Sequence, residues 1–197
     1  MSKMSDKIVE KHPLGFFLPA NAKLLMLGSF PPKRERWSMN FYYPNIQNDM
    51  WRIIGLLFFG NKEHFLTETK KAFDEVRIRA FCQEKGFAFG DTAMEVVRLK
   101  DNASDKFLEV VKPFNPEEVL SRLPECHAIV ITGQKAMDTL LSVLPAAEPR
   151  TGCYVETDFN HRQLKIFRMP SSSRAYPMPL EKKAQIYLNM FKELGML

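Results

Sequence analysis

The chain has 197 residues, of which 45% are hydrophobic and 26% are charged, and this composition is ordinary for a soluble globular protein. A chain of this length predicts one domain, spanning residues 1–197, with a single sizeable core. The formal net charge of +5 and the sequence pI of about 9.1 favour an anionic partner such as a nucleic acid, although many basic proteins bind none.

Cysteine usage and apolar patterning exclude several classes of protein. The three cysteines, Cys82, Cys126 and Cys153, are far apart and form no C-x-x-C pair. This spacing argues against an iron–sulfur site and a disulfide framework, and it fits buried thiols in a reducing compartment. The N-terminus lacks the apolar segment of a signal peptide, and no apolar run is long enough to span a bilayer. We therefore expect a cytoplasmic protein with no membrane partner.

Short apolar runs predict three strands, at residues 24–27, 87–89 and 128–131. Residues 164–169 alternate between apolar and charged side chains and predict a fourth strand. The first run is apolar at every position, as in a strand buried on both faces, and it ends at Gly28 and Pro31-Pro32. Residues 92–97 are expected to form a helical turn before a polar loop at 100–105. Residues 1–11 are charged and are expected to be frayed.

Helical spacing and capping residues predict five helices between these strands. They are expected at residues 49–59, 65–85, 115–123, 135–144 and 180–194. The third begins with Asn115-Pro116-Glu117, which combines a preferred N-cap, a proline at the first helical position and an acidic first turn. Strands that alternate with helices predict an α/β fold, a three-layer α/β/α sandwich with a central, mostly parallel four-stranded sheet.

Four motifs follow one another along this framework. The first lies between Gly28 and Trp51 and combines a G-x-x-P pattern, an aromatic pair and an N-x-x-W pattern. The other three are residues 86–92, 128–133 and 169–174. In this order they resemble the uracil-DNA glycosylase superfamily, closest to its hypoxanthine-DNA glycosylase and mismatch-specific uracil-DNA glycosylase branches. The resemblance covers nearly the whole chain.

The resemblance implies a monofunctional DNA glycosylase of base excision repair. Such an enzyme hydrolyses the N-glycosidic bond of a flipped deaminated base, here hypoxanthine or uracil, in double- or single-stranded DNA. The site must hold the extruded base, offer it hydrogen-bond donors and position one water, so no cofactor is expected. The four histidines have no cysteine or acid at ligand spacing, which argues against a metal. We expect a monomer.

Asn48 is the first candidate for the catalytic role. In the hypoxanthine branch, the asparagine before the helix is functionally important, and Asn48 stands at that place. Its amide can position a water beside the sugar without adding charge to the pocket. The alternative is that Asn48 simply caps the following helix, since asparagine is a preferred N-cap. Both roles can coexist.

The first motif departs from the commoner family pattern. Uracil-cleaving members carry an acid or amide directly before the motif's proline, and Phe30 occupies that position. Phe30 cannot activate water, although backbone N–H groups near Gly28 and Ser29 can still face a base or phosphate. Phe41, Tyr42 and Tyr43 offer faces on which a flipped base could stack, and Tyr42 is favoured; core packing is the alternative, above all for Phe41. The expected base pocket therefore comprises Gly28, Ser29, Phe30, Pro31, Phe41, Tyr42 and Asn45.

Asp91 is the second catalytic candidate. It follows a strand at the place where uracil-specific relatives carry a base-reading asparagine. A carboxylate accepts but does not donate, so it reads a different base edge, such as N1–H of hypoxanthine, or positions water. The alternative is an aspartate that ends the strand in a turn.

The loop after the fourth strand is the expected DNA contact. Ser171, Ser172 and Ser173 offer hydroxyl and backbone donors to phosphates, and Arg174 adds a forked cation. Tyr176 or Met178 is placed to enter the gap left by a flipped nucleotide. Met169 stands where uracil-specific relatives have a histidine, so that hydrogen bond to the base is absent. The alternative is a polar loop that only joins strand to helix.

Two other functions remain open at this point. Phe30 and Met169 are compatible with a non-catalytic nucleic-acid-binding protein that kept the fold after losing its water-activating group. A serine hydrolase built on Ser171 to Ser173 is the weaker alternative, because no G-x-S-x-G motif accompanies these residues.

Overall fold

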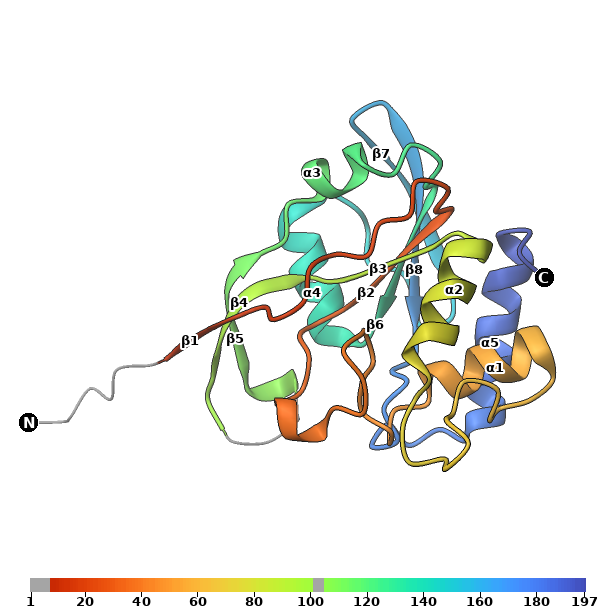
Figure 1. The fold of residues 1–197 in the computed structure, drawn as a ribbon. Coiled ribbons are helices and arrows are strands. Elements are labelled where there is room, and N and C mark those ends of the chain that lie inside the picture. Colours follow the sequence, from red (N-terminus) through yellow and green to blue (C-terminus); the bar gives the residue numbers. More distant parts are fainter. Residues whose placement is uncertain (1–7, 101–104) are drawn as a thin grey trace, which may run out of the picture.

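A five-stranded sheet forms the centre of the computed structural model, which describes residues 8–100 and 105–197 (Figure 1). The strand order is β3-β2-β6-β8-β7. The strands are β2 (Leu24–Gly28), β3 (Phe87–Asp91), β6 (Ala128–Thr132), β7 (Tyr154–Phe159) and β8 (Arg162–Met169). The first three and β8 run parallel, whereas β7 pairs with β8 in the antiparallel direction.

Helices cover both faces of this sheet, as Figure 1 shows. On one face lie α1 (Met50–Phe59), α2 (Glu75–Lys85) and α5 (Leu180–Glu193); on the other lie α3 (Pro116–Ser121) and α4 (Gln134–Val143). Every residue of β2, β3 and β6 is buried, because alternate side chains enter the two layers between sheet and helices. The apolar runs of the sequence therefore mark the strands that are covered on both sides.

Alternate residues of one strand belong to two separate cores. Leu24 and Met26 of β2 pack with Trp51 in the core beneath α1, α2 and α5. Leu25 and Leu27 pack with Leu140 in the core beneath α3 and α4. This division confirms the three-layer α/β arrangement expected from the sequence.

A second, smaller sheet flanks the first. Its order is β1-β4-β5, from β1 (Val9–Lys11), β4 (Ala93–Arg98) and β5 (Leu108–Pro113), and all its pairings are antiparallel. Short 3-10 helices occupy Arg34–Arg36 and Asp105–Phe107. From β1 the chain runs along the edge of β3, where Phe17 and Phe89 exchange two backbone hydrogen bonds of 3.0 and 2.9 Å. This path brings the N-terminal segment to the end of β3.

The strand expectations need four corrections, one of which is that Leu108–Pro113 forms the unpredicted strand β5. The central sheet has five strands rather than four, because β7 is an additional edge strand. Residues 93–98 form strand β4 and not a helical turn. Val9–Lys11 is an ordered strand instead of a frayed end, and its pairing with β4 supplies the order. Residues 1–7 and 101–104 lie outside the described residues.

The expected helix at 65–85 is also too long. Only Glu75–Lys85 is helical, because Asp74 caps the helix by accepting a hydrogen bond from the Arg77 backbone N–H at 3.0 Å. The preceding segment instead forms turns in which Phe65 and Phe73 are buried in the core. Among the described residues, no helix is long and apolar enough to cross a membrane.

Candidate active site

The parallel strands bring the motifs of the sequence to one edge of the sheet. Gly28, the last residue of β2, pairs in register with Asp91, the last residue of β3. Thr132 of β6 pairs with Met169 of β8 at the same edge. Carboxyl edges of open α/β sheets are the usual place for ligands, because loops from several strands converge there.

Asp91 is buried at this edge, and each of its carboxylate oxygens has a defined neighbour. Oδ2 lies 2.7 Å from Nε2 of His12. Oδ1 lies 2.7 Å from the position that a Cβ on residue 28 would occupy. A side chain at position 28 would therefore collide with the carboxylate, and glycine is required for this close approach. The G-x-x-P motif makes room for Asp91.

His12 holds the other side of this carboxylate. Its side chain is only 3% exposed. Nδ1 lies 2.8 Å from the Leu14 carbonyl oxygen and 3.1 Å from the Leu14 backbone nitrogen, so either tautomer finds a main-chain partner. The edge of the ring meets Phe30 at a centroid distance of 5.2 Å. These contacts fix the imidazole, and Phe30 contributes to the site by packing.

His12 was not among the site residues expected from the sequence, because no histidine has a cysteine or an acid at metal-ligand spacing. It stands 79 residues from Asp91 in the chain, and the pairing of β1 with β4 and of Phe17 with Phe89 brings the two together. No local sequence signal identifies such a contact. Of these two residues, only Asp91 was a candidate site residue from the sequence.

Tyr43 lies beside Gly28 at the same edge of the sheet. Its hydroxyl forms a 2.8 Å hydrogen bond with the Thr132 hydroxyl and lies 3.6 Å from the Cβ position of residue 28. Its backbone has a positive φ of 54°, which a non-glycine residue adopts only when its surroundings impose it. Burial raises the pKa of this hydroxyl well above its usual value. Tyr43 therefore stays a neutral hydrogen-bonding group.

Phe41 and Tyr42 lie in the hydrophobic core. Phe41 packs edge-on against Phe17, and the Tyr42 ring stacks on Phe89. The Tyr42 hydroxyl donates to the Gly15 carbonyl at 3.0 Å. The structure thus favours the core alternative for these two rings, and it places the half-buried Tyr43 at the strand edge. The sequence favoured Tyr42 among these three adjacent rings, because nothing in it shows which of them faces the core.

Ser29 and Pro31 shape the loop after β2. The Ser29 carbonyl accepts from Ala93 N–H at 3.1 Å, and its hydroxyl hydrogen-bonds to the Asp105 carboxyl group. Burial raises the pKa of Asp105, and the negative charge of Asp91 raises it further. The Pro31 carbonyl accepts from Arg98 at 2.8 Å. Asp105, absent from the sequence expectations, is a second carboxyl group near Asp91.

The loop before α1 presents Asn48. The Asn45 carbonyl accepts from Asn48 N–H at 2.8 Å, and the Asn45 side chain accepts from Gln47 N–H. Asn48 Oδ1 accepts from Met50 N–H at 2.9 Å, an Asx-turn bond to the first residue of α1, whereas Asp49 occupies the N-cap position. Asn48 is therefore not the N-cap, although its side chain bonds the start of the helix. The amide NH₂ group and the second lone pair of Oδ1 retain their hydrogen-bonding capacity.

The serine loop lies directly against this asparagine loop. Asn48 and Ser173 form an isolated antiparallel bridge, and Asp49 N–H donates to the Ser172 carbonyl at 2.8 Å. Ser172 is buried, whereas Tyr176 is exposed. Ser171 and Ser173 use their hydroxyls as acceptors for backbone N–H groups two residues further on. These bonds set the shape of the loop and leave each hydroxyl proton free to be donated.

Arg174 has an internal partner that the sequence did not indicate. Its side chain is about half exposed, and Nε donates to Oδ1 of the buried Asp49 at 3.0 Å. A guanidinium has further N–H donors, so this bond orients Arg174 without using all of them. Within the described residues, no group of three or more His, Cys, Asp or Glu side chains could hold a metal ion.

Comparisons with known proteins identify the class of fold. No protein-family model matches the chain, and no curated protein sequence matches it. A solution NMR structure from Methanosarcina acetivorans matches with a TM-score of 0.62 and 19% sequence identity, covering 95% of this chain and 99% of that one. That protein carries the provisional name uracil DNA glycosylase. The chain therefore has a uracil-DNA-glycosylase-like α/β fold.

Proposed function

We propose that this protein is a monofunctional DNA glycosylase that removes a deaminated base, hypoxanthine or uracil, from DNA. The observation that carries the proposal is the convergence of the motif segments at one sheet edge. Asp91 lies over Gly28, and the loop containing Asn48 is hydrogen-bonded to the serine loop. The fold shared with a protein provisionally named a uracil DNA glycosylase, over 95% of this chain, supports it.

The proposed reaction needs positioning more than covalent chemistry. As the bond between C1′ and the base nitrogen breaks, the sugar becomes cation-like and the base takes the electron pair. Asn48 then positions the water that attacks C1′, through its NH₂ group and the remaining lone pair of Oδ1, and the proton that the water loses goes to the departing base. The carboxylate of Asp91 accepts an N–H of the base and so holds the extruded base in place. The Tyr43 ring offers the face on which the extruded base stacks.

The charge on Asp91 favours hypoxanthine over uracil. Both bases present an N–H on the edge that faces away from the sugar. In uracil this N–H stands between two carbonyl oxygens, whereas in hypoxanthine it has one carbonyl and one C–H beside it. A carboxylate attracts the N–H but repels each flanking oxygen, so hypoxanthine suffers less repulsion. An asparagine at this position would instead donate to one of the oxygens.

A non-catalytic nucleic-acid-binding protein is the second candidate function. The observation that favours it is Phe30, which is buried among Ala93, Val96 and Leu108 at the place where uracil-cleaving relatives carry a polar residue. Such a protein would retain the DNA surface and leave the base in place. Because both candidates bind DNA, binding alone does not separate them.

End-labelled duplexes and single strands carrying one hypoxanthine or one uracil test the proposal. After incubation and alkali treatment, a strand break at the modified position reports an abasic site. We expect breaks at hypoxanthine at a higher rate than at uracil, and none at an unmodified base pair. Binding without any break on all these substrates would favour the non-catalytic alternative.

A further inference from the structure

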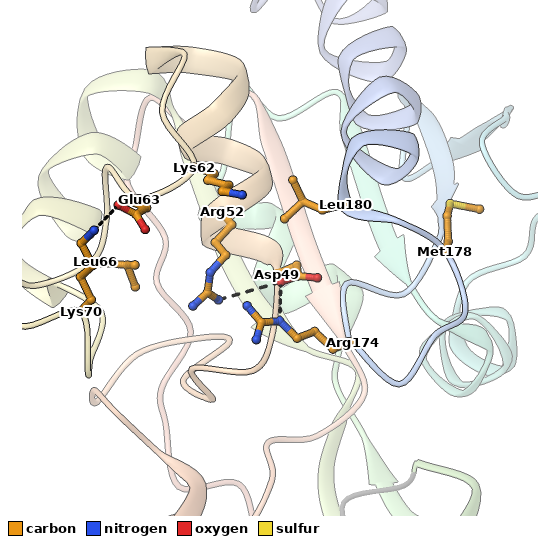
Figure 2. Close-up of a pocket in the computed structure, with 9 residues that line it drawn as sticks. All are labelled: Asp49, Arg52, Lys62, Glu63, Leu66, Lys70, Arg174, Met178 and Leu180. Carbon is orange, nitrogen blue, oxygen red and sulfur yellow. Dashed lines mark hydrogen bonds and ion pairs between the residues drawn. The ribbon is translucent and has the colours of Figure 1, made fainter.

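A cavity of about 620 Å³ lies next to Asp49, and no role in the proposed reaction accounts for it (Figure 2). Its walls come from the start of α1, the loop after α1 and the segment before α5. Arg52, Lys62 and Arg174 line it together with Asp49. Leu180 and Met178 complete the side towards α5, as Figure 2 shows. We name this cavity the Asp49 pocket.

One buried carboxylate faces three cations at this place. Arg174 Nε lies 3.0 Å from Asp49 Oδ1, and Arg52 NH1 lies 3.9 Å from the same oxygen. Lys183 Nζ lies 3.9 Å from Oδ2. A single negative charge neutralises one of these groups, so the cluster keeps an excess of positive charge. The other carboxylate of the pocket, Glu63, is paired with Lys70 at 2.6 Å.

The surroundings enforce this excess of charge. The Lys183 side chain is completely buried and donates to the Ser173 carbonyl at 2.7 Å, so it cannot turn away into solvent. Arg52 donates to the Ile46 and Asn48 carbonyls at 2.7 and 3.2 Å. Burial lowers the pKa of Arg52, and the nearby charge of Arg174 lowers it further. Like charges held at close range in this way favour the binding of an anion.

The two guanidinium groups still have donors for such an anion. Arg52 uses NH1 for its backbone contacts, and Arg174 uses Nε for Asp49. Each group has five N–H donors in a planar fork, and this geometry matches the oxygens of a phosphate. Figure 2 shows both groups beside Asp49, with Lys62 on the same wall of the pocket.

We propose that the Asp49 pocket binds a phosphate of the DNA backbone, in the strand whose nucleotide is excised. This inference rests on the proposed function for the identity of its ligand. The pocket adjoins Asn48 through Arg52 and the serine loop through Arg174, so a phosphate held there flanks the extruded nucleotide. Arg52 and Lys62 become DNA-contacting residues that the sequence motifs did not indicate.

The salt dependence of DNA binding tests the contact. Arg52→Lys, Lys62→Gln and Arg174→Ala are compared with Lys112→Gln, whose exposed lysine lies on β5 in the smaller sheet. An unmodified duplex is used, so that no excision is required. For Lys62→Gln and Arg174→Ala we expect the log–log slope to flatten by about 0.9 for each lost phosphate contact. Arg52→Lys keeps its charge and should weaken binding with little change of slope. Lys112→Gln should match the wild type.

Inorganic phosphate provides a second, independent measurement. At matched ionic strength, phosphate should raise the melting temperature of the wild type and of Lys112→Gln above that in chloride, because it binds the folded state alone. Arg174→Ala should lose most of this increase. Slopes and melting temperatures that are the same for Lys62→Gln, Arg174→Ala and Lys112→Gln would overturn the proposal. If these measurements show the phosphate contact but the wild type excises no base, the Asp49 pocket is a DNA-phosphate site and the proposed glycosylase function is wrong.

Discussion

Two buried aspartates stand at the candidate site, and their surroundings differ. Asp91 has one nitrogen partner, His12, and lies against the backbone of Gly28 near aromatic rings. Asp49 has three cationic neighbours and borders an open cavity. The same side chain therefore gives two kinds of site. Asp91 supplies an acceptor to a ligand that offers N–H groups, whereas Asp49 anchors cations that suit a ligand with negative charge.

Removing the charge of Asp49 should have the largest effect. Asp49→Asn leaves Arg52, Arg174 and the fully buried Lys183 without their carboxylate, and breaking a buried pair in this way costs about 3–5 kcal/mol. Urea unfolding should show this loss. Glu63→Gln, which removes the exposed pair with Lys70, is the control and should cost far less, because exposed ion pairs contribute little to stability. Similar losses in both variants would mean that Asp49 does not anchor the cluster.

Asn48→Ala separates water positioning from support of the helix start. We expect single-turnover excision to fall by roughly 10²-fold or more, the size seen when one positioning or electrostatic group is removed. DNA affinity should change little, because the amide faces water and sugar rather than phosphate. The melting temperature should also fall, since the hydrogen bond to Met50 N–H at the start of α1 is lost at a cost of about 1 kcal/mol. Lost stability with full excision would leave Asn48 with a structural role only.

His12 is expected to act through Asp91. His12→Phe fills the space but removes the donor to Oδ2, and excision should fall roughly tenfold, about 1.4 kcal/mol. His12→Gln places an amide N–H near the same oxygen and should restore most of the rate. The double variant His12→Phe/Asp91→Asn should be no slower than Asp91→Asn alone. Additive losses, with no recovery by glutamine, would show that His12 has a purely structural role.

The smallest expected effect is that of Asp105→Asn, which should change the pH dependence of stability. The pKa of Asp105 is raised in the folded state by burial, so the folded protein keeps a proton that the unfolded chain loses near pH 3.9. The free energy of unfolding therefore falls as the pH rises through this range, relative to Asp105→Asn, which cannot titrate. Unfolding titrations from roughly pH 3.5 to pH 7.5 measure the difference. A stability difference that grows with pH would contradict the raised pKa.

The sequence predicted those strands that have a local signal. Three buried apolar runs became β2, β3 and β6, because a strand covered on both faces is largely apolar. The alternating residues 164–169 became part of β8. In β7 exposed and half-buried residues alternate, so the edge strand lacked such a run. In β4, pairing with β1 and β5 decides the conformation, and those partners are distant in the chain. Asp74 is a capping signal that was present but was not used to start α2.

The candidate-site residues that the sequence predicted lie at or just beyond the ends of recognisable helices and strands. Asn48, Asp91 and Arg174 follow recognisable elements, and the structure places them at the same edge of the sheet or in the adjoining loops. His12, Asp49 and Lys183 were missed for a physical reason. Their importance comes from contacts across the fold, such as the 2.7 Å bond from Lys183 to the Ser173 carbonyl. Position in the chain does not reveal such contacts.

The most direct test of the account is single-turnover excision of hypoxanthine and uracil by the wild type and by Asp91→Asn. The wild type should release hypoxanthine faster than uracil. Asp91→Asn should lose roughly 10²-fold or more on hypoxanthine while its relative rate on uracil rises, because the amide can donate to a uracil oxygen. Its DNA affinity should stay unchanged. A wild type that leaves both bases in place, or an Asp91→Asn variant with unaltered rates and preference, would contradict the assignment of Asp91 as the base-reading carboxylate.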